Sequence, residues 1–150
     1  MEIALCVIRP RPWRAADPAR QLLDGYMARC AKTQPVTLEE FRSEAALWAW
    51  AEKRRGRVAA FHMLADSGGR QYTSEQFAGK VAEVRDHGTQ LMILAIGPAD
   101  GWSGEALARA NTTVSFGKMT LPHELAAVIA AEQIYRATTI WSGHPYHGGH

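Results

Sequence analysis

Residues 90–98 read Gln-Leu-Met-Ile-Leu-Ala-Ile-Gly-Pro, and this stretch decides the fold. Its apolar residues run from Leu91 to Ile96 without alternating with polar ones, which is typical of a strand buried on both faces of a parallel sheet. Gly97 and Pro98 then end the strand, because glycine favours turns and proline cannot donate to a sheet ladder. The stretch therefore predicts an inner strand over Gln90–Ile96.

Four further strands and four helices are predicted on either side of this strand. The strands are short apolar runs bounded by turn-forming residues, the last of them more weakly patterned: Ile3–Ile8, Val58–Leu64, Thr112–Phe116 and Val36–Phe41. The helices place apolar residues at helical spacing: Ala16–Ala31, Ser43–Arg55, Ser74–His87 and Leu121–Trp141. Strands that alternate with helices indicate an α/β fold, a mostly parallel sheet flanked by helices. No linker or repeat divides the chain, so we expect one domain over residues 1–150.

Capping residues mark the ends of two of these helices. Thr73, followed three residues later by Gln76, is a good N-terminal cap, and Gly88 is placed to end the same helix. Thr120 is expected to cap the last helix, with Pro122 in its first turn.

Composition indicates an ordinary globular chain. Of its 150 residues 47% are hydrophobic and 21% charged, and the formal net charge is +2, which excludes a disordered acidic or polybasic protein. No apolar run reaches the roughly 18 residues that a membrane span needs. Met1–Ile8 lacks the basic segment and cleavage site of a signal peptide, so we expect a first strand there. Cys6 and Cys30 are too few for a disulfide framework or a zinc site and are expected to be reduced and mostly buried in a cytoplasmic protein.

Positive charge is concentrated in the first half of the chain. Residues 1–75 hold 12 Lys and Arg against 9 Asp and Glu, whereas residues 76–150 hold 5 against 6. Two clusters dominate: Arg9, Arg11 and Arg14 around Trp13, and Lys53, Arg54, Arg55 and Arg57. Basic residues beside an aromatic side chain can contact a phosphate backbone. The second cluster is more simply a basic helix end that complements the helix dipole, since Gly56 stops the helical pattern there.

Three strand ends are followed by loops rich in glycine. These loops are Ala65–Arg70, Gly97–Trp102 and Gly117–His123. Each of them taken alone is typical of a tight turn. Ligands of open α/β sheets collect at the carboxyl ends of the strands, and glycine lets the backbone approach a ligand closely. If the three strand ends are neighbours, the loops together form a pocket lined by backbone groups.

Other chemistries find little support. The phosphate-binding motifs G-x-G-x-x-G and G-x-x-x-x-G-K-[ST] are absent, and so is the G-x-S-x-G nucleophile elbow. His144, His147 and His150 are spaced for weak metal chelation in a glycine-containing tail, but no resident metal is expected, because ordered sites take ligands from separate elements with supporting residues.

The last predicted helix carries an apolar stripe that continues into a charged pair. Leu125, Val128 and Ile129 share a face with Glu132 and Arg136. As a plain i, i+4 pair, the two charged residues contribute only about 0.3–0.5 kcal/mol. If the stripe packs against a partner, Arg136 becomes a fixed donor suited to a phosphate or a base edge.

Five segments, in order and spacing, carry a resemblance to a known family: Thr73–Ala78, Ile96–Gly97, Gly117–His123, Glu132–Ala137 and Pro145–His147. Together they resemble the bacterial 23S rRNA pseudouridine-N3 methyltransferases of the SPOUT superfamily. The resemblance spans essentially the whole chain and is strongest over residues 58–147. Its most specific parts are the Thr-Leu-Pro-His run at residues 120–123 and the later Gln-x-Tyr-Arg-Ala at 133–137.

The resemblance implies a fold, a cofactor and partners. Proteins of this family have a deep trefoil knot at the C-terminal end of the sheet, which is an exception to the rule that chains do not thread loops. They are homodimers that hold S-adenosylmethionine in the knot loops and need no metal or membrane. Their substrate is N3 of a pseudouridine in helix 69 of 23S rRNA, in the assembled 70S ribosome.

The resemblance also implies the site residues. Cofactor contacts are expected at the residues that match the family's knot loops: Ala65, Gly97, Pro98, Gly117, Lys118, Met119, Thr120, Leu121 and Pro122. Catalysis is expected of Arg136, with His147 and Tyr146 from the tail, where His147 or solvent would accept the N3 proton. RNA contacts are expected from Arg9, Arg11, Arg14 and His123.

Two residues depart from the family pattern. Pro98 stands where a second glycine is usual, so a contact there must use its carbonyl or its ring. Ala65 replaces a usual leucine, and the lost apolar surface is worth about 1 kcal/mol of packing on a ligand. Two alternatives therefore stay open: an RNA-binding protein that keeps the fold without catalysis, and a related methyltransferase that acts on tRNA.

Overall fold

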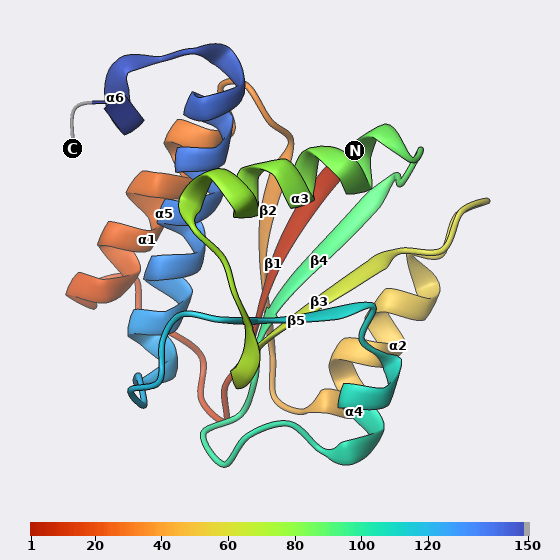
Figure 1. Ribbon diagram of the computed structural model, residues 1–150. Coiled ribbons are helices and arrows are strands. Elements are labelled where there is room, and N and C mark those ends of the chain that lie inside the picture. Colours follow the sequence, from red (N-terminus) through yellow and green to blue (C-terminus); the bar gives the residue numbers. More distant parts are fainter. Residues whose placement is uncertain (149–150) are drawn as a thin grey trace.

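Strand β4 (Leu91–Ile96) is an inner strand of a five-stranded sheet in the computed structural model, which describes residues 1–148 (Figure 1). The order is β2-β1-β4-β3-β5, with β1 Glu2–Ile8, β2 Val36–Phe41, β3 Phe61–Gln71 and β5 Thr112–Ser115. The four pairings between neighbouring strands are parallel, and all six residues of β4 are buried. The predicted α/β fold with a parallel sheet is confirmed.

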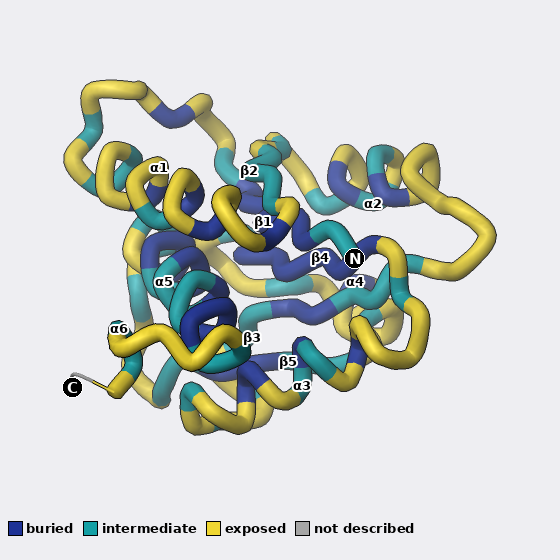
Figure 2. The backbone as a smooth tube through the Cα atoms, turned by 90° about the horizontal axis from the view of Figure 1, so that it is seen from above, coloured by how far each residue is buried: buried dark blue, intermediate teal, exposed yellow. Residues whose placement is uncertain are grey.

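Helices cover both faces of this sheet (Figures 1 and 2). One face carries α1 (Pro18–Cys30), α3 (Ser74–Asp86) and α5 (His123–Ser142); the other carries α2 (Glu44–Lys53) and α4 (Gly104–Arg109). On the first face Leu23, Val81 and Ile134 pack into one cluster with strand residues, and on the second Leu47 and Ala106 do the same. Burial of each large side chain contributes roughly 1.5–3 kcal/mol, so the two clusters hold both layers onto the sheet.

Helix α3 begins where its capping residues predict. The Thr73 hydroxyl accepts a hydrogen bond from the backbone N–H of Gln76, and the Gln76 side chain accepts one from the N–H of Thr73. The helix ends before Gly88, which takes a φ of 87° that glycine adopts without strain. The predicted cap and stop are confirmed, and they fix the point where the chain passes from β3 into α3.

The third strand differs from its prediction at both ends. It was expected over Val58–Leu64, but Val58 is exposed, and the strand begins at Phe61 and continues to Gln71. Both Ala65 and Arg70 pair with Val114 of β5, so residues 66–69 form a bulge between two paired stretches. A Cβ on Gly69 would lie 2.8 Å from the backbone of Val114, so the bulge requires glycine there.

The last helix also differs at its start. It begins at His123 with Pro122 as the residue before it, and no side chain caps it, so the expectation that Thr120 is the cap was wrong. Proline at 122 cannot continue a helix backwards, because it holds the preceding residue in extended conformation. Two short helices were not predicted: α4, which Ser103 caps, and α6 (Pro145–Gly148), which lies against α5 in the C-terminal tail.

Both cysteines are reduced and buried, as predicted. Burial raises the pKa of the Cys30 thiol to about 12 and raises that of Cys6 as well, so neither is a reactive thiolate near neutral pH. Among the helices of residues 1–148, none is long and apolar enough to cross a membrane. The arrangement of strands and helices is consistent with the expected C-terminal knot.

Candidate active site

A pocket of about 550 Å³ opens at the carboxyl ends of β3, β4 and β5. Its wall comes from three segments: residues 65–67 where the bulge of β3 begins, most of residues 96–102 from the end of β4, and most of residues 114–123 from β5 to the start of α5, joined by Ala126 of α5. Neighbouring strands bring these segments together, because β3 pairs with both β4 and β5. The pocket predicted from three glycine-rich loops is therefore present.

The loop after β4 is fixed by Trp102. The Trp102 indole N–H donates to the carbonyl of Ala65 at 2.8 Å, and its ring lies so close to Gly97 that a Cβ there would be 2.7 Å from Cε2. The carbonyl of Pro98 accepts from the N–H of Gly101 at 2.9 Å, which closes a turn. Gly97 and Pro98 both line the pocket, and the indole of Trp102 occupies the space that a side chain at Gly97 would take.

The segment between β5 and α5 bends at Gly117. Its φ is 128°, and nothing lies within 4 Å of the position a Cβ would take, so one side of the backbone is open. The Ser115 hydroxyl bonds to both the N–H and the carbonyl of Gly117, at 3.1 and 3.0 Å. This short bridge holds the bend between the strand and the pocket wall.

The expected cofactor residues, Lys118 apart, line this pocket: Ala65, Gly97, Pro98, Gly117, Met119, Thr120, Leu121 and Pro122. Lys118 is exposed and outside the wall, and Met119 has 84% of its surface exposed at the rim. Several wall residues were not among the predicted site residues, including Asp66, Trp102 and Phe116. Each of these three lies in or beside a predicted glycine-rich loop, and that position in the sequence could have indicated them as pocket residues.

A second pocket of about 310 Å³ adjoins the first. The two share Val114, Phe116 and Gly117 as lining residues. The rest of the second pocket comes from the end of β3, the start of α3 and the middle of α5: Gln71, Tyr72, Ser74, Phe77, Ser115, Ile129 and Gln133. Aromatic and amide side chains thus line a cavity that shares part of its wall with the first.

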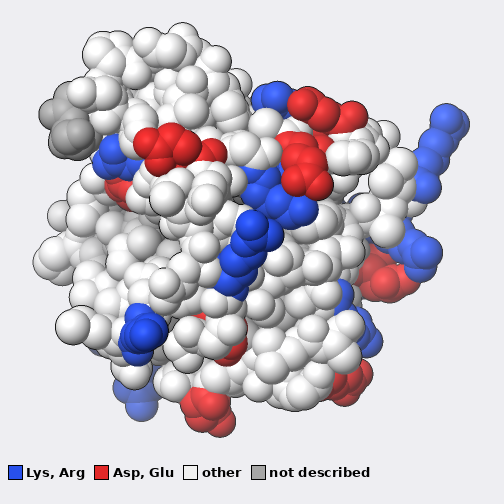
Figure 3. Space-filling view, viewed as in Figure 1, with Lys and Arg blue, Asp and Glu red and all other residues white. Residues whose placement is uncertain are grey.

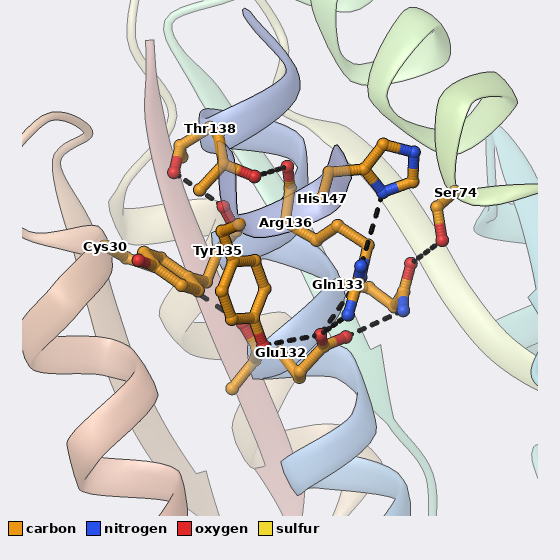
Figure 4. A network of polar contacts seen from close by, with 11 residues as sticks. Cys30, Ser74, Glu132, Gln133, Tyr135, Arg136, Thr138 and His147 are labelled. Atoms are coloured by element: carbon orange, nitrogen blue, oxygen red, sulfur yellow. Dashed lines mark hydrogen bonds and ion pairs between the residues drawn. The ribbon is translucent and has the colours of Figure 1, made fainter. Parts of the chain in front are cut away.

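Polar side chains of α5 converge on Glu132 (Figure 4). Arg136 Nε donates to its carboxylate at 3.0 Å and Nη2 donates to the same oxygen, while the Tyr146 hydroxyl donates to it at 3.0 Å. The bond to Glu132 raises the pKa of Arg136 further above its ordinary value. Burial, followed by hydrogen bonds to Tyr26 and Glu132, raises the pKa of the Tyr146 hydroxyl, which stays protonated at neutral pH. The predicted Glu132–Arg136 pair is present, with the tail packed onto it.

The hydrogen bonds of His147 fix its tautomer. Nδ1 lies 3.3 Å from Arg136 Nη1, and a guanidinium can only donate, so Nδ1 is the acceptor. Nε2 then carries the proton and donates to Glu75 at 2.9 Å. The pKa of the Glu75 carboxyl is lowered, first by its own backbone N–H and then by His147. The lone pair with which His147 would take up a substrate proton is therefore occupied by Arg136 in this conformation.

The polar cluster and the first pocket lie towards opposite ends of α5. His123 lines the pocket, and Arg136 is 13 residues further along the helix, which is about 20 Å at 1.5 Å per residue. Within one chain the structure therefore brings the expected cofactor residues together, and separately the three expected catalytic ones, without joining the two groups. Of the apolar stripe, Leu125 is exposed, Ile129 lines the second pocket and Val128 is buried.

The expected RNA-contacting residues differ in accessibility. Arg11 and Arg14 are exposed, whereas the Arg9 side chain is only 13% exposed and bonds to Glu124 at 3.2 Å. Its guanidinium also lies over the ring of Trp13, 4.4 Å from the centroid. His123 is 20% exposed in the wall of the first pocket. Arg9 thus mainly links the end of β1 to the start of α5 through its ion pair with Glu124.

The second basic cluster lies at the end of α2, as the sequence indicated. Arg54 pairs with Glu2 at 2.7 Å, and Arg55 pairs with Glu52 at 3.3 Å. The loop that follows projects at the right of Figure 1, and basic side chains gather on that side in Figure 3. Half of the cluster is therefore engaged in ion pairs within the chain.

The histidines of the tail form no metal site in the described part of the chain, where no group of three or more candidate ligands is found. His144 Nδ1 accepts from the N–H of Tyr146 at 3.1 Å, and His147 bonds to Arg136 and Glu75. His150, the third member of the predicted chelating set, lies outside the described residues.

Comparisons with known proteins place this chain in a family. The family model described as "Predicted SPOUT methyltransferase" matches residues 1–147. The chain is 46% identical to the ribosomal RNA large subunit methyltransferase H of Koribacter versatilis over 138 residues, 91% of this chain and 94% of that one. It is 40% identical to the protein of the same name from Sinorhizobium medicae over 146 residues, 88% of this chain and 91% of that one. The solved SpoU methyltransferase AviRb of Streptomyces viridochromogenes aligns with a TM-score of 0.49 and 13% identity, over 93% of this chain and 61% of that one, a likeness too weak to carry an argument.

Proposed function

The chain belongs to the SPOUT methyltransferase family, and on that premise we propose that it transfers a methyl group from S-adenosylmethionine to N3 of a pseudouridine in helix 69 of 23S rRNA. The observation that carries the proposal is the convergence of three glycine-rich loops on one pocket at the strand ends, with one side of the Gly117 backbone open. The name of the relatives, ribosomal RNA large subunit methyltransferase H, supports the class of substrate. The family resemblance supports the nucleotide.

The residues of the pocket fit this cofactor. Its volume of about 550 Å³ is in the range of small-molecule sites, and Trp102 and Leu121 offer apolar wall to an adenine ring. Gly117 leaves one side of its backbone open to the cofactor, while the Asp66 carboxylate suits the positive charge of the sulfonium. Pro98 would pack through its ring, because its carbonyl already closes a turn. S-adenosylmethionine supplies, when bound, a methyl group activated by a sulfonium sulfur.

The chain's own residues have to stabilise the negative charge that the base acquires when N3 is deprotonated. To accept a methyl group N3 would have to lose its proton, which would leave negative charge on N3 and the neighbouring oxygens. Arg136, held in place by Glu132, is the group suited to stabilise that charge. Because Arg136 occupies the lone pair of His147, the proton passes to solvent unless the tail rearranges.

The separation of the two groups of residues supports a homodimer. In one chain Arg136 lies about 20 Å along α5 from His123, the first residue of the helix in the pocket wall. A two-fold symmetric pair places the same surfaces of two copies against each other, so the polar cluster of one copy can serve the pocket of its partner. Leu125 and Met119, both exposed beside the pocket, supply apolar surface for such an interface.

The test of the substrate is a methylation assay on matched particles. Purified protein with labelled S-adenosylmethionine is expected to methylate 70S ribosomes that lack the modification and to leave free 23S rRNA and tRNA almost unlabelled. Methylation of tRNA would show that the protein is instead the related methyltransferase that acts on tRNA. Calorimetry with S-adenosylmethionine separates both enzymes from a non-catalytic RNA-binding protein, which Pro98 favours and which would bind no cofactor.

The test of the composite site is complementation. A Gly97→Leu copy lacks a working pocket and an Arg136→Ala copy lacks the arginine, so each homodimer is expected to be inactive. After mixing and exchange of subunits, heterodimers hold one intact pocket facing one intact Arg136, and activity returns. Mixtures that stay inactive although native mass spectrometry detects heterodimers would contradict the shared site.

A further inference from the structure

The second pocket has the size and lining of a site for a single planar base. Its volume of about 310 Å³ is at the small end of ligand sites. Tyr72 and Phe116 provide aromatic surface of the kind on which unpaired bases stack, and Phe77 closes the interior. Because Val114, Phe116 and Gly117 line both pockets, a base seated here lies next to the proposed methyl donor.

Gln133 is the polar residue of this pocket whose orientation is fixed. Its amide nitrogen donates to Glu132 Oε2 at 2.7 Å, and a carboxylate only accepts, so this end must be the nitrogen. Its oxygen accepts from the Ser74 hydroxyl at 2.9 Å (Figure 4). An amide can make four hydrogen bonds, so one N–H and one oxygen lone pair are left for a ligand.

We infer that this pocket takes the target base and that Gln133 distinguishes pseudouridine from uridine; the inference rests on the proposed function. A base about to be methylated at N3 must turn N3 towards the donor, which leaves N3 itself unavailable to Gln133. Pseudouridine has a second ring N–H at N1, next to the carbonyl at C2, because its ribose is attached to carbon. That pair of one donor and one acceptor matches the one acceptor and one donor that Gln133 retains.

Uridine cannot make this pair. Its N1 carries the ribose and has no hydrogen, so the oxygen of Gln133 would be left without a donor at that edge. Sites built to bond a particular N–H or O–H discriminate strongly against analogues that lack it, since the buried partner is then unpaired. Ser74 and Glu132 keep the amide from rotating to suit a different edge, so they act as positioning residues for Gln133.

The activity test compares 70S ribosomes that carry pseudouridine or uridine at the target position, in single turnover. The wild type is expected to prefer pseudouridine by at least about 100-fold. Gln133→Met keeps the length of the side chain but removes both polar atoms, and is expected to lower that preference at least tenfold, by slowing the pseudouridine reaction alone. Gln21→Met, the matched control, makes the same substitution at an exposed position of α1 outside the pocket and is expected to retain the preference. An unchanged preference in Gln133→Met would overturn the inference.

A binding experiment needs no methyl transfer, so a failure of the proposed reaction and a failure of this pocket can be told apart. The side-chain amide signal of Gln133, identified by its loss in Gln133→Met, is followed by NMR while pseudouridine or uridine nucleoside is added to the wild type. The signal is expected to move with pseudouridine and not with uridine. Equal shifts with both nucleosides, or none with either because a second copy of the chain fills the pocket, would overturn the inference.

Discussion

Gly97 lies where a side chain has no room. A Cβ at this position would meet the Trp102 ring at 2.7 Å, and the indole could retreat only by breaking its bond to Ala65. We expect Gly97→Leu to abolish S-adenosylmethionine binding, measured by calorimetry, while the chain still unfolds cooperatively. Gly79→Ala is the control, because nothing lies within 4 Å of that helical position and the change should stabilise α3 by about 0.5–1 kcal/mol. Cofactor affinity close to that of the wild type in Gly97→Leu would place the cofactor elsewhere.

Arg136 is expected to matter for turnover and not for cofactor binding. Its guanidinium is bound to Glu132, and the residue lies about 20 Å along α5 from His123 in the pocket wall of its own chain. Arg136→Ala should lower single-turnover methylation of 70S ribosomes by roughly 100- to 1000-fold, as loss of a group that stabilises transition-state charge does. Calorimetry should give a nearly unchanged affinity for S-adenosylmethionine. A variant that loses affinity and rate in parallel would show that Arg136 supports the fold of the pocket.

At the scale of residues, the sequence could predict what is local or shared with the family. The Glu132–Arg136 pair follows from i, i+4 spacing, and Gly97 and Gly117 follow from the family's loops. The bond of His147 to Glu75 joins residues 72 positions apart, and no local pattern contains it. The burial of Arg9 was missed for the same reason, since its partner Glu124 is 115 residues away.

Among the elements, α3 depends on its first residues. The Thr73–Gln76 capping box satisfies backbone N–H groups at the point where the chain leaves β3, beside the second pocket. Thr73→Ala should cost about 1 kcal/mol of unfolding free energy, which for a chain of this size lowers the midpoint of thermal melting by about 2–4 °C. Thr73→Ser retains the hydroxyl and should melt close to the wild type. Equal losses in both variants would show that the methyl group, not the cap, is what matters.

Strand β3 responds to pH through His62. Its ring packs against Trp48 with centroids 5.2 Å apart, and burial lowers its pKa below the ordinary 6.5. The unfolded chain therefore takes up this proton more readily, and the stability that neutral His62 provides is lost as the pH falls below 6.5 towards the lowered value. Denaturant unfolding at pH 7 and pH 5 should show a smaller loss for His62→Phe, which keeps the ring contact without titrating. Equal losses in both proteins would assign the acid sensitivity to other groups.

Element prediction succeeded where burial is uniform and failed where tertiary pairing overrides a turn signal. β4 is buried on both sides and appears in the sequence as an unbroken apolar run. The Asp-Ser-Gly-Gly run at 66–69 is typical of a loop, but β5 pairs with β3 on both sides of it and makes it a bulge inside one strand. The short helix α4 was not predicted from the sequence, because six residues provide too few turns for a periodic pattern.

Across the molecule, the positively charged side chains serve two purposes: some stabilise the fold, and others are exposed and available to bind RNA. A net charge of +2 per chain provides little non-specific attraction, so binding must come from shape and from several surfaces together. Arg11 and Arg14 are exposed, whereas Arg9 is enclosed between Glu124 and Trp13. The three arginines, equivalent in the sequence, should therefore behave differently.

Neutralising Arg11 and Arg14 together to Gln should weaken ribosome binding and make the slope of log affinity against log salt shallower by about 1.4–1.8, the effect of two lost phosphate contacts. Thermal stability should stay the same, because both side chains are exposed.

Arg9→Met should have the opposite effects. It removes the bond to Glu124 and the contact with Trp13, which costs about 1–2 kcal/mol of stability, and it leaves the salt slope unchanged. Filter binding between 50 and 200 mM salt, roughly the range over which phosphate contacts are lost, together with calorimetric melting, measures both. A salt slope that changes as much in Arg9→Met as in the double variant would show that Arg9 leaves its internal pair to bind RNA.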